Sequence, residues 1–338
     1  MYFIRVDLDR KSGLGHYYRI LSILKYLKIK NYKIVTSYLS KNSFFDLNKK
    51  NILNLYSHEK RNLSEIEDAK LFLKLIKDKK KTIVIKDSYK LNYNWERQVK
   101  KKIKKLVVIS DDIHSKHFSD FYINHNPELL NLNNIHRKIL KQNNKKNCNF
   151  LLGPKFAMFN ASLDKKKLIK TDVLFYNGGS GNVFVYKKII DHLIKKTNLR
   201  IGLIIGPFCN IKKYANEYKN SKRLKILIQP NNILPYIKST KLFISPAGIS
   251  MFESSFLKTP SLLFRMNSNQ NLNDSEYEKL GHYFILDKFD LRFTKKISEL
   301  ILNLYKNIND LKKLFNGSSI NLKNIKKNYV RELLFKLK

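Results

Sequence analysis

The sequence predicts an α/β protein of two Rossmann-like domains that face a cleft. Its 338 residues exceed the ~100–200 residues of a typical single domain. Short β-branched, apolar runs alternate with longer amphipathic stretches, which is the order expected of a mostly parallel sheet with helices on both faces. The alternation restarts after a polar stretch rich in Asn and Lys at 141–149. These three observations favour a first domain at residues 1–155 and a second at 156–338, with a linker near 145–165.

The first half begins with a strand at Tyr2–Asp7. The strands expected after it are Lys33–Tyr38, Ile52–Leu55, Thr82–Lys86, Lys105–Ser110 and Phe121–Asn124. The helices expected between them are Gly15–Lys28, a short one near Phe44–Lys49, Ser64–Lys77 and Tyr93–Lys104. Ser64 followed three residues later by Glu67 has the pattern of a capping box, which predicts a helix start at that point.

The second half repeats this order. Strands are expected at Asp172–Tyr176, Arg200–Ile205, Leu224–Ile228, Lys241–Ser245 and Ser261–Arg265. A helix is expected at Phe184–Lys196, and the tail from Thr294 onward is nearly all helical, with a break at Asn316-Gly317. Because open α/β sheets bind ligands outside the carboxyl ends of their strands, functional motifs should lie there.

The composition is strongly basic: 67 Lys and Arg against 27 Asp and Glu give 67 − 27 = +40. The charge is spread along the chain, and the aromatic residues fall mainly inside apolar runs. A nucleic-acid module concentrates its charge and interleaves aromatic residues. We therefore interpret the charge as solvated helix faces on a compositionally skewed chain, with nucleic-acid binding as a minority hypothesis.

The cysteines and the N-terminus indicate the compartment. Cys148 and Cys209 lie far apart, so neither a disulfide framework nor a zinc site is expected. Arg5 and Asp7 interrupt the first apolar run too early for a signal peptide. No run approaches the ~18 apolar residues of a membrane span. A cytoplasmic monomer with at most peripheral membrane contact is expected.

A glycine turn between the first strand and the first helix forms the first motif. Gly13 and Gly15 allow a tight turn, and the helix start offers free N–H groups suited to phosphate. Tyr18 stands where a dinucleotide fingerprint requires glycine, which disfavours NAD. The helix dipole disfavours a cationic His16, which should therefore accept a proton, and Arg19 lies one turn further on the same face. A structural turn with an incidental histidine is the alternative.

Carboxylates follow two later strands. Asp87 and Tyr89 end one strand at the edge where His16 is expected, so Asp87 could orient His16 or a sugar hydroxyl. Helix capping by Asp87 and simple packing of Tyr89 are the alternatives. Asp111 and Asp112 close the next strand, where paired carboxylates can bind a metal or a base and can equally cap a turn.

The second half carries a glycine loop and a helix start. Gly178, Gly179 and Ser180 directly follow its first strand and suit a diphosphate. Glu253 lies about one turn inside a helix that begins near Gly248, where a carboxylate can accept two ribose hydroxyls. The remaining residues of this candidate site are Ser250, Asn269 and Gln270.

Together these residues make the chain resemble the UDP-sugar hydrolases of pseudaminic acid biosynthesis, which are in turn similar to the lipid II-forming N-acetylglucosaminyltransferase. The motifs that carry the resemblance run in order through most of the chain: Arg5 and Asp7; Gly13, Gly15, His16 and Arg19; Asp87 and Tyr89; Trp95-Glu96; Asp111-Asp112; Gly153-Pro154 and Ala157; Gly178-Gly179-Ser180; Gly206-Pro207; Gly248 through Glu253 with Pro260; and Asn269-Gln270.

The resemblance implies a GT-B fold in which the last helix, within Ser318–Lys338, crosses back to the first domain. It implies release of UDP from a UDP-diacetamido-trideoxy-hexose, with His16 activating water, with Asp87 and Tyr89 in the catalytic group and with Gly13, Gly15 and Arg19 among the residues that bind the substrate. No metal or cofactor is implied. Three positions depart from the family, namely Phe156 for its Tyr, Asn160 for its Arg and Gly181 for its acidic residue, and they concern sugar recognition more than UDP binding.

Two other functions stay open at this stage. A glycosyltransferase of the same fold would use a sugar or lipid acceptor in place of water. A basic binding protein without catalysis would leave the ordered glycine loops unexplained.

Overall fold

The computed structural model divides into two compact units, Met1–Met158 with Lys323–Lys338, and Phe159–Leu322. The structure describes residues 1–8, 14–38, 51–56, 63–129, 132–163, 169–179, 183–206, 218, 221–230, 232–265, 280, 283–286, 292, 294–313 and 320–337. The predicted division after residue 155 therefore lies three residues from the division between the units. Residues 323–338, which we assigned to the second domain, pack with the first unit instead.

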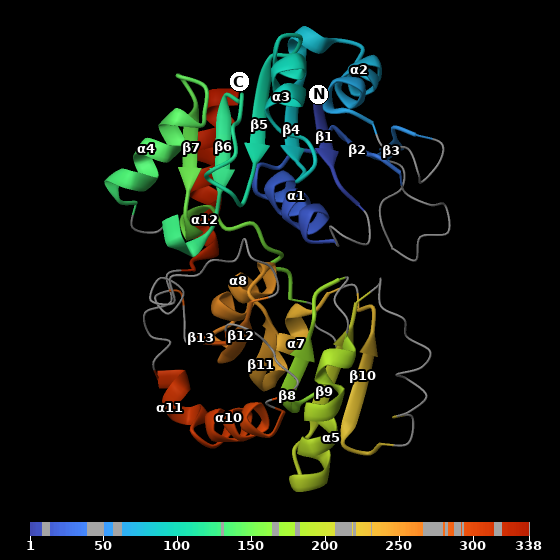
Figure 1. The fold of residues 1–338 in the computed structure, drawn as a ribbon, viewed down its shortest axis with the longest axis vertical. Helices are drawn as coiled ribbons and strands as arrows, with labels where there is room; N and C mark the ends of the chain where they lie inside the picture. Colours follow the sequence, from blue (N-terminus) through green and yellow to red (C-terminus); the bar gives the residue numbers. More distant parts are fainter. Residues whose placement is uncertain are drawn as a thin grey trace. The chain divides into compact units, whose positions relative to one another are not determined.

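The first unit is built on a seven-stranded sheet in which every neighbouring pair is parallel (Figure 1). Its strands are β1 (Tyr2–Val6), β2 (Tyr32–Thr36), β3 (Ile52–Asn54), β4 (Ile83–Asp87), β5 (Lys105–Ile109), β6 (Phe121–Asn124) and β7 (Asn149–Leu152). The spatial order is β3-β2-β1-β4-β5-β6-β7. The order reverses between β1 and β4, so a ligand crevice is expected outside the carboxyl ends of these two strands.

Four α-helices connect these strands among the described residues: α1 (Gly15–Tyr26), α2 (Glu65–Lys74), α3 (Tyr93–Lys100) and α4 (Asn134–Gln142). The predicted capping box at the start of α2 is confirmed, because the Glu67 N–H donates to the Ser64 hydroxyl and the Ser64 N–H donates to the Glu67 carboxylate. Phe72 on α2 and Trp95 on α3 are fully buried in the core on one face of the sheet.

The end of the chain completes this first unit. It comprises α12 (Leu322–Tyr329), a π-helical turn at Val330–Leu334 and α13 (Phe335–Leu337). The buried Tyr329 hydroxyl donates to the carbonyl of Phe156 over 2.7 Å, and its ring lies 5.7 Å from that of Tyr26 between centroids. The expectation that the last helix returns to the first domain is confirmed.

The second unit has a six-stranded, fully parallel sheet in the order β10-β9-β8-β11-β12-β13 (Figure 1). Its strands are β8 (Thr171–Tyr176), β9 (Ile201–Ile205), β10 (Leu224–Ile228), β11 (Thr240–Pro246), β12 (Ser261–Phe264) and β13 (Tyr283–Leu286). Its described α-helices are α5 (Lys187–Lys196), α7 (Leu234–Ser239), α8 (Ile249–Phe256), α10 (Thr294–Lys306) and α11 (Ile308–Lys313). The strand order reverses between β8 and β11.

Both faces of this second sheet are buried, as a continuously apolar strand predicts. On β8, Val173 and Phe175 belong to the core formed with α5 and α10, whereas Leu174 belongs to a separate cluster on the other face, with Ile237 of α7. Alternate residues of one strand thus hold helices on opposite sides of the sheet.

The structure corrects the predicted linker. Residues 149–152, placed within the linker at 145–165, form β7 and pair with β6 at the edge of the first sheet. The helix α4 and the strand β13 were not predicted as separate elements. The helix expected near Phe44–Lys49 and the break at Asn316-Gly317 lie outside the described residues.

No helix in the described part of the chain combines the length and the apolar character needed to cross a membrane.

Candidate active site in the first unit and candidate nucleotide site in the second

Helix α1 carries two functional candidates on one face. It begins at Gly15, and no side chain caps its N-terminus. His16 and Arg19 are three residues apart, so they project on the same side of the helix. Both side chains are buried, with about 4% of each residue exposed.

Asp87, the last residue of β4, joins these two side chains. One of its oxygens, Oδ1, lies 2.5 Å from His16 Nδ1. Arg19 donates to both of its oxygens, from Nε to Oδ2 and from Nη2 to Oδ1. The carboxylate is fully buried. Burial alone would raise the pKa of Asp87, but the charges of Arg19 and His16 outweigh it and hold that pKa below its ordinary value.

The 2.5 Å contact with Asp87 favours the tautomer of His16 that carries its proton on Nδ1, although Arg19 Nη2 also lies 3.1 Å from that atom. An ionised carboxylate only accepts hydrogen bonds, so the imidazole proton lies on Nδ1 and is donated to Asp87. The Nε2 atom then keeps its lone pair and can take a proton. Sequence reasoning offered Asp87 two partners, His16 or a sugar hydroxyl, and the structure gives it His16.

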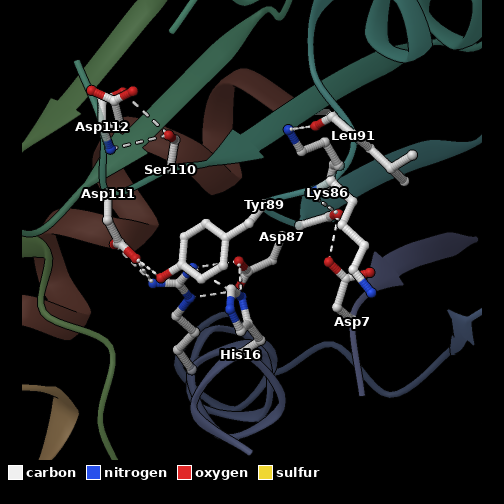
Figure 2. A network of polar contacts seen from close by, with 12 residues as sticks. Asp7, His16, Lys86, Asp87, Tyr89, Leu91, Ser110, Asp111 and Asp112 are labelled. Carbon is white, nitrogen blue, oxygen red and sulfur yellow. Dashed lines mark hydrogen bonds and ion pairs between the residues drawn. The ribbon is translucent and has the colours of Figure 1, made fainter. Parts of the chain in front are cut away.

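Arg19 is held from its other side by Asp111, which follows β5. Its Nη1 donates to both carboxylate oxygens of Asp111, over 2.8 and 2.9 Å. The Tyr89 hydroxyl donates to Oδ2 of the same carboxylate over 2.6 Å. The Tyr89 ring packs edge-on against the His16 ring, with centroids 4.5 Å apart, and Figure 2 shows it between Asp111 and His16. Tyr89 thus bridges the histidine and the second carboxylate.

The neighbouring carboxylate, Asp112, has a different role. It accepts from the backbone N–H of His114 and from the hydroxyl of Ser115, which caps the turn after β5. The two adjacent carboxylates therefore do not act as a pair. Among the described residues, no group of His, Cys, Asp and Glu side chains could hold a metal ion.

Arg5 and Asp7 of the first strand region are also buried. Arg5 binds the Asp68 carboxylate of α2 through Nε and Nη2. Asp7 accepts a 2.7 Å hydrogen bond from the Ser88 hydroxyl, which ties the end of β1 to the residue after β4 (Figure 2). The hydrogen bond between Ser88 and Asp7 thus joins the two strand ends between which the sheet order reverses.

In the second unit, a glycine turn follows β8. Gly178 has a φ of +73°, a backbone conformation that residues other than glycine rarely adopt. A Cβ on Gly206, just after β9, would lie 2.4 Å from the carbonyl oxygen of Gly178 and 2.6 Å from that of Gly179. The loop at the end of β8 is therefore packed against a position that only glycine can occupy.

Helix α8 begins after β11, across the strand-order reversal from the glycine turn. Its N-cap residue is Gly248, and a Cβ added there would meet nothing within 4 Å. Ser250 is buried, with its Oγ 3.2 Å from that of Ser245. Glu253 is also buried, and the backbone N–H of Asn160 donates to it. Burial raises the pKa of Glu253 to about 8, because one donor does not offset the loss of water.

Four predicted site residues, Gly13, Ser180, Asn269 and Gln270, lie outside the described residues. The structure brings His16, Asp87, Tyr89 and Arg19 together in the first unit and places Gly178, Gly179, Gly248, Ser250 and Glu253 at the carboxyl edge of the second sheet. Sequence reasoning missed the bidentate contact of Asp111 with Arg19. Its only sequence signal is that Asp111, like Asp87, ends a strand of the parallel sheet.

No family model matches the chain. It is 24% identical to an uncharacterized protein of Methanocaldococcus jannaschii, over 98% of this chain and 71% of that protein. It is 27% identical to the pseudaminic acid cytidylyltransferase and UDP-2,4-diacetamido-2,4,6-trideoxy-beta-L-altropyranose hydrolase of Helicobacter pylori, over 82% of this chain. That match spans 47% of the Helicobacter protein, so the chain corresponds to about half of it.

Two solved structures cover nearly the whole chain. MurG of Acinetobacter baumannii matches with a TM-score of 0.60 at 11% identity, over 99% of each chain. The UDP-GlcNAc 2-epimerase of Methanocaldococcus jannaschii matches with a TM-score of 0.59 at 16% identity, over 99% of this chain and 100% of the other. The chain therefore has the GT-B fold of two parallel-sheet α/β domains, which confirms the predicted fold class.

Proposed function

We propose that the chain is an enzyme acting on a UDP-sugar, and specifically a hydrolase that releases UDP from a UDP-diacetamido-trideoxy-hexose. The observation that carries this proposal is the buried contact between His16 Nδ1 and Asp87, which orients a proton-accepting Nε2 where the strand order reverses. The similarity to the Helicobacter hydrolase supports the choice of reaction and substrate class.

In the proposed reaction, His16 Nε2 takes a proton from a water molecule whose oxygen attacks the anomeric carbon. The bond between that carbon and the UDP oxygen breaks, and UDP leaves with the bonding electron pair. The proton makes His16 an imidazolium, which the ionised Asp87 stabilises from the opposite side of the ring. Tyr89 packs against the ring and restricts its orientation.

The second unit is proposed to hold the nucleotide. The glycine turn at Gly178 and Gly179, with Ser180, suits the diphosphate, and Gly13 and Gly15 in the first unit are proposed to approach the substrate as well. Gly248, Ser250, Asn269 and Gln270 complete the proposed UDP site. The ribose hydroxyls are assigned to Glu253, whose carboxylate would gain two donors on binding.

Arg19 was expected to bind substrate directly. Its Nε, Nη1 and Nη2 atoms all contact Asp87 or Asp111. We therefore assign it a positioning role, in which it holds the carboxylate that holds His16.

The test is release of UDP from a panel of UDP-sugars by the native protein, by His16→Asn and by His192→Asn, a control on α5 of the second unit. Loss of the base should reduce turnover ~10²–10⁴-fold while UDP affinity is retained, and the control should keep full activity. Full activity of folded His16→Asn would refute the mechanism.

Two further measurements define the reaction. In water enriched in ¹⁸O, the released UDP should contain no label, because the bond to carbon is the one that breaks. UDP release that requires an added sugar or lipid acceptor would instead identify a glycosyltransferase. The absence of UDP release from every substrate, together with no measurable UDP binding, would favour a non-catalytic protein.

A further inference from the structure

Asp111 has no assigned part in the proposed reaction, yet it lies one side chain away from the proposed base. It binds Arg19 through both oxygens, and Arg19 in turn binds Asp87, which holds His16. Such bidentate contacts between arginine and a carboxylate fix both position and orientation. Without Asp111, the Nη1 atom of Arg19 would lose both of these hydrogen bonds.

The charges of this cluster balance only when His16 carries a proton. Asp87 and Asp111 are both ionised: burial opposes this, but Arg19 lowers the pKa of each below its ordinary value. The net charge of the two carboxylates, the guanidinium and the imidazole is −1 when His16 is neutral and 0 when His16 is an imidazolium. Without the negative charge of Asp111, the net charge would be 0 with neutral His16 and +1 with the imidazolium.

The other titratable groups that face the cluster stay neutral. Burial lowers the pKa of His125, after β6, to about 4, so it is uncharged near neutral pH. Burial and the nearby Asp111 raise the pKa of Tyr89, which keeps its proton. Burial likewise raises the pKa of Tyr329 of the C-terminal helix, which interacts with Arg19. None of these groups can replace the negative charge of Asp111.

From this geometry we infer that Asp111 is a positioning residue: its bidentate contact with Arg19 holds the guanidinium that orients Asp87 against His16, and its negative charge offsets that of the guanidinium. The inference rests on the proposed role of His16. Its structural part, the link from Asp111 through Arg19 to the imidazole, stands whichever UDP-sugar reaction the protein performs.

The direct test is the titration of His16, followed by NMR in protein labelled in its histidines, in Asp111→Asn. Asparagine keeps the shape and one acceptor oxygen but removes the charge. The midpoint of the His16 titration should move to lower pH, because a nearby negative charge is lost. Asp112→Asn is the matched control, since it removes the same charge from the adjacent turn cap, and it should leave the midpoint within a few tenths of a unit.

A second variant tests the same link without changing a charge. Tyr89→Phe keeps the ring against His16 but removes the hydrogen bond to Asp111. The Asp111 carboxylate is then less neutralised, so the His16 midpoint should move to higher pH, opposite to the effect of Asp111→Asn. This variant keeps the inference testable if Asp111→Asn does not fold.

Kinetics supply an independent readout. The acid limb of the kcat profile of Asp111→Asn should move to lower pH by the same amount, with UDP affinity unchanged. An unshifted His16 titration in a folded Asp111→Asn protein, or an equal shift in Asp112→Asn, would overturn the inference. If no UDP-sugar is turned over but the NMR shifts occur, the proposed function fails and the inference about Asp111 stands.

Discussion

Glu253→Gln should make the second unit more stable at slightly alkaline pH and leave it nearly unchanged at acidic pH. The pKa of Glu253 in the folded chain is about 8, against an ordinary value of 4.5. Between these values the folded state binds a proton that the unfolded state does not. Stability therefore falls as the pH rises through this window, and glutamine, which cannot ionise, removes the fall.

The magnitude follows from the width of the window. The difference of 8 − 4.5 = 3.5 pH units, at ~1.4 kcal/mol per unit, gives an upper bound of ~5 kcal/mol. The stabilisation by Glu253→Gln should thus be close to zero near pH 4.5 and reach several kcal/mol above pH 8. This is a large part of the ~5–15 kcal/mol that stabilises a typical domain.

The assay is urea unfolding at pH 5 and pH 8.5, followed by far-ultraviolet circular dichroism. The chain has one tryptophan, Trp95, which is buried in the first unit. Its fluorescence therefore reports a unit that the substitution does not touch, and its transition should coincide in both proteins. Glu299→Gln, an exposed change on α10, controls for the loss of one surface charge.

Equal stabilisation at both pH values would show that Glu253 is not held in an environment that disfavours its charge. A confirmed difference would mean that the chain carries a carboxylate that destabilises it at neutral pH. This loss of stability has a functional reason if the ribose hydroxyls of a bound nucleotide donate the hydrogen bonds that Glu253 lacks in the free protein.

Three other predictions concern the second unit and the surface charge. Glu253→Ala should weaken UDP binding by ~1.5–3 kcal/mol in calorimetry, and unchanged affinity in a folded variant would remove Glu253 from the nucleotide site. Gly206→Ala should destabilise the second unit by ~1–3 kcal/mol in urea unfolding, because the added Cβ would lie 2.4 Å from the carbonyl oxygen of Gly178. The control is Gly248→Ala, whose added Cβ would have no neighbour within 4 Å, and it should leave the stability unchanged. Random-sequence DNA should bind weakly at physiological salt in fluorescence anisotropy, and a complex near the ~10⁻⁸ M of specific binders would contradict a compositional origin of the +40 charge.

Features that depend on short stretches of sequence were predictable. The capping box at Ser64 and Glu67 needs only four residues, and most strands of the two parallel sheets are compact, largely apolar runs bounded by polar residues. The strand β7 was not predicted, because residues 141–149, which lead into it, are strongly polar and indicated a linker at this point. Its pairing with β6 depends on the sheet, which brings Phe121 opposite Asn149.

The sequence identified the residues that meet in the candidate site one by one, but not the contacts between them. A glycine turn before a helix marked His16, and the end of a strand marked Asp87. The contact of Arg19 with Asp111 joins side chains 92 positions apart, and nothing local distinguishes Asp111 from Asp112. Only the parallel order of β1, β4 and β5 makes one carboxylate face the helix and leaves the other to cap a turn.

The return of the C-terminal helix to the first unit constrains the order of events during synthesis. The first unit is interrupted after Met158 and resumes at Lys323, and these 323 − 158 = 165 positions take ~8–33 s to translate at ~5–20 residues per second. Tyr329, which packs against Tyr26 and Phe156, is synthesised only after this interval, 173 positions after Phe156. The second unit, being continuous, can finish folding first. The nascent chain therefore passes through a state with a complete second unit and an unfinished first unit, in which the aromatic surface around Phe156 is not yet covered.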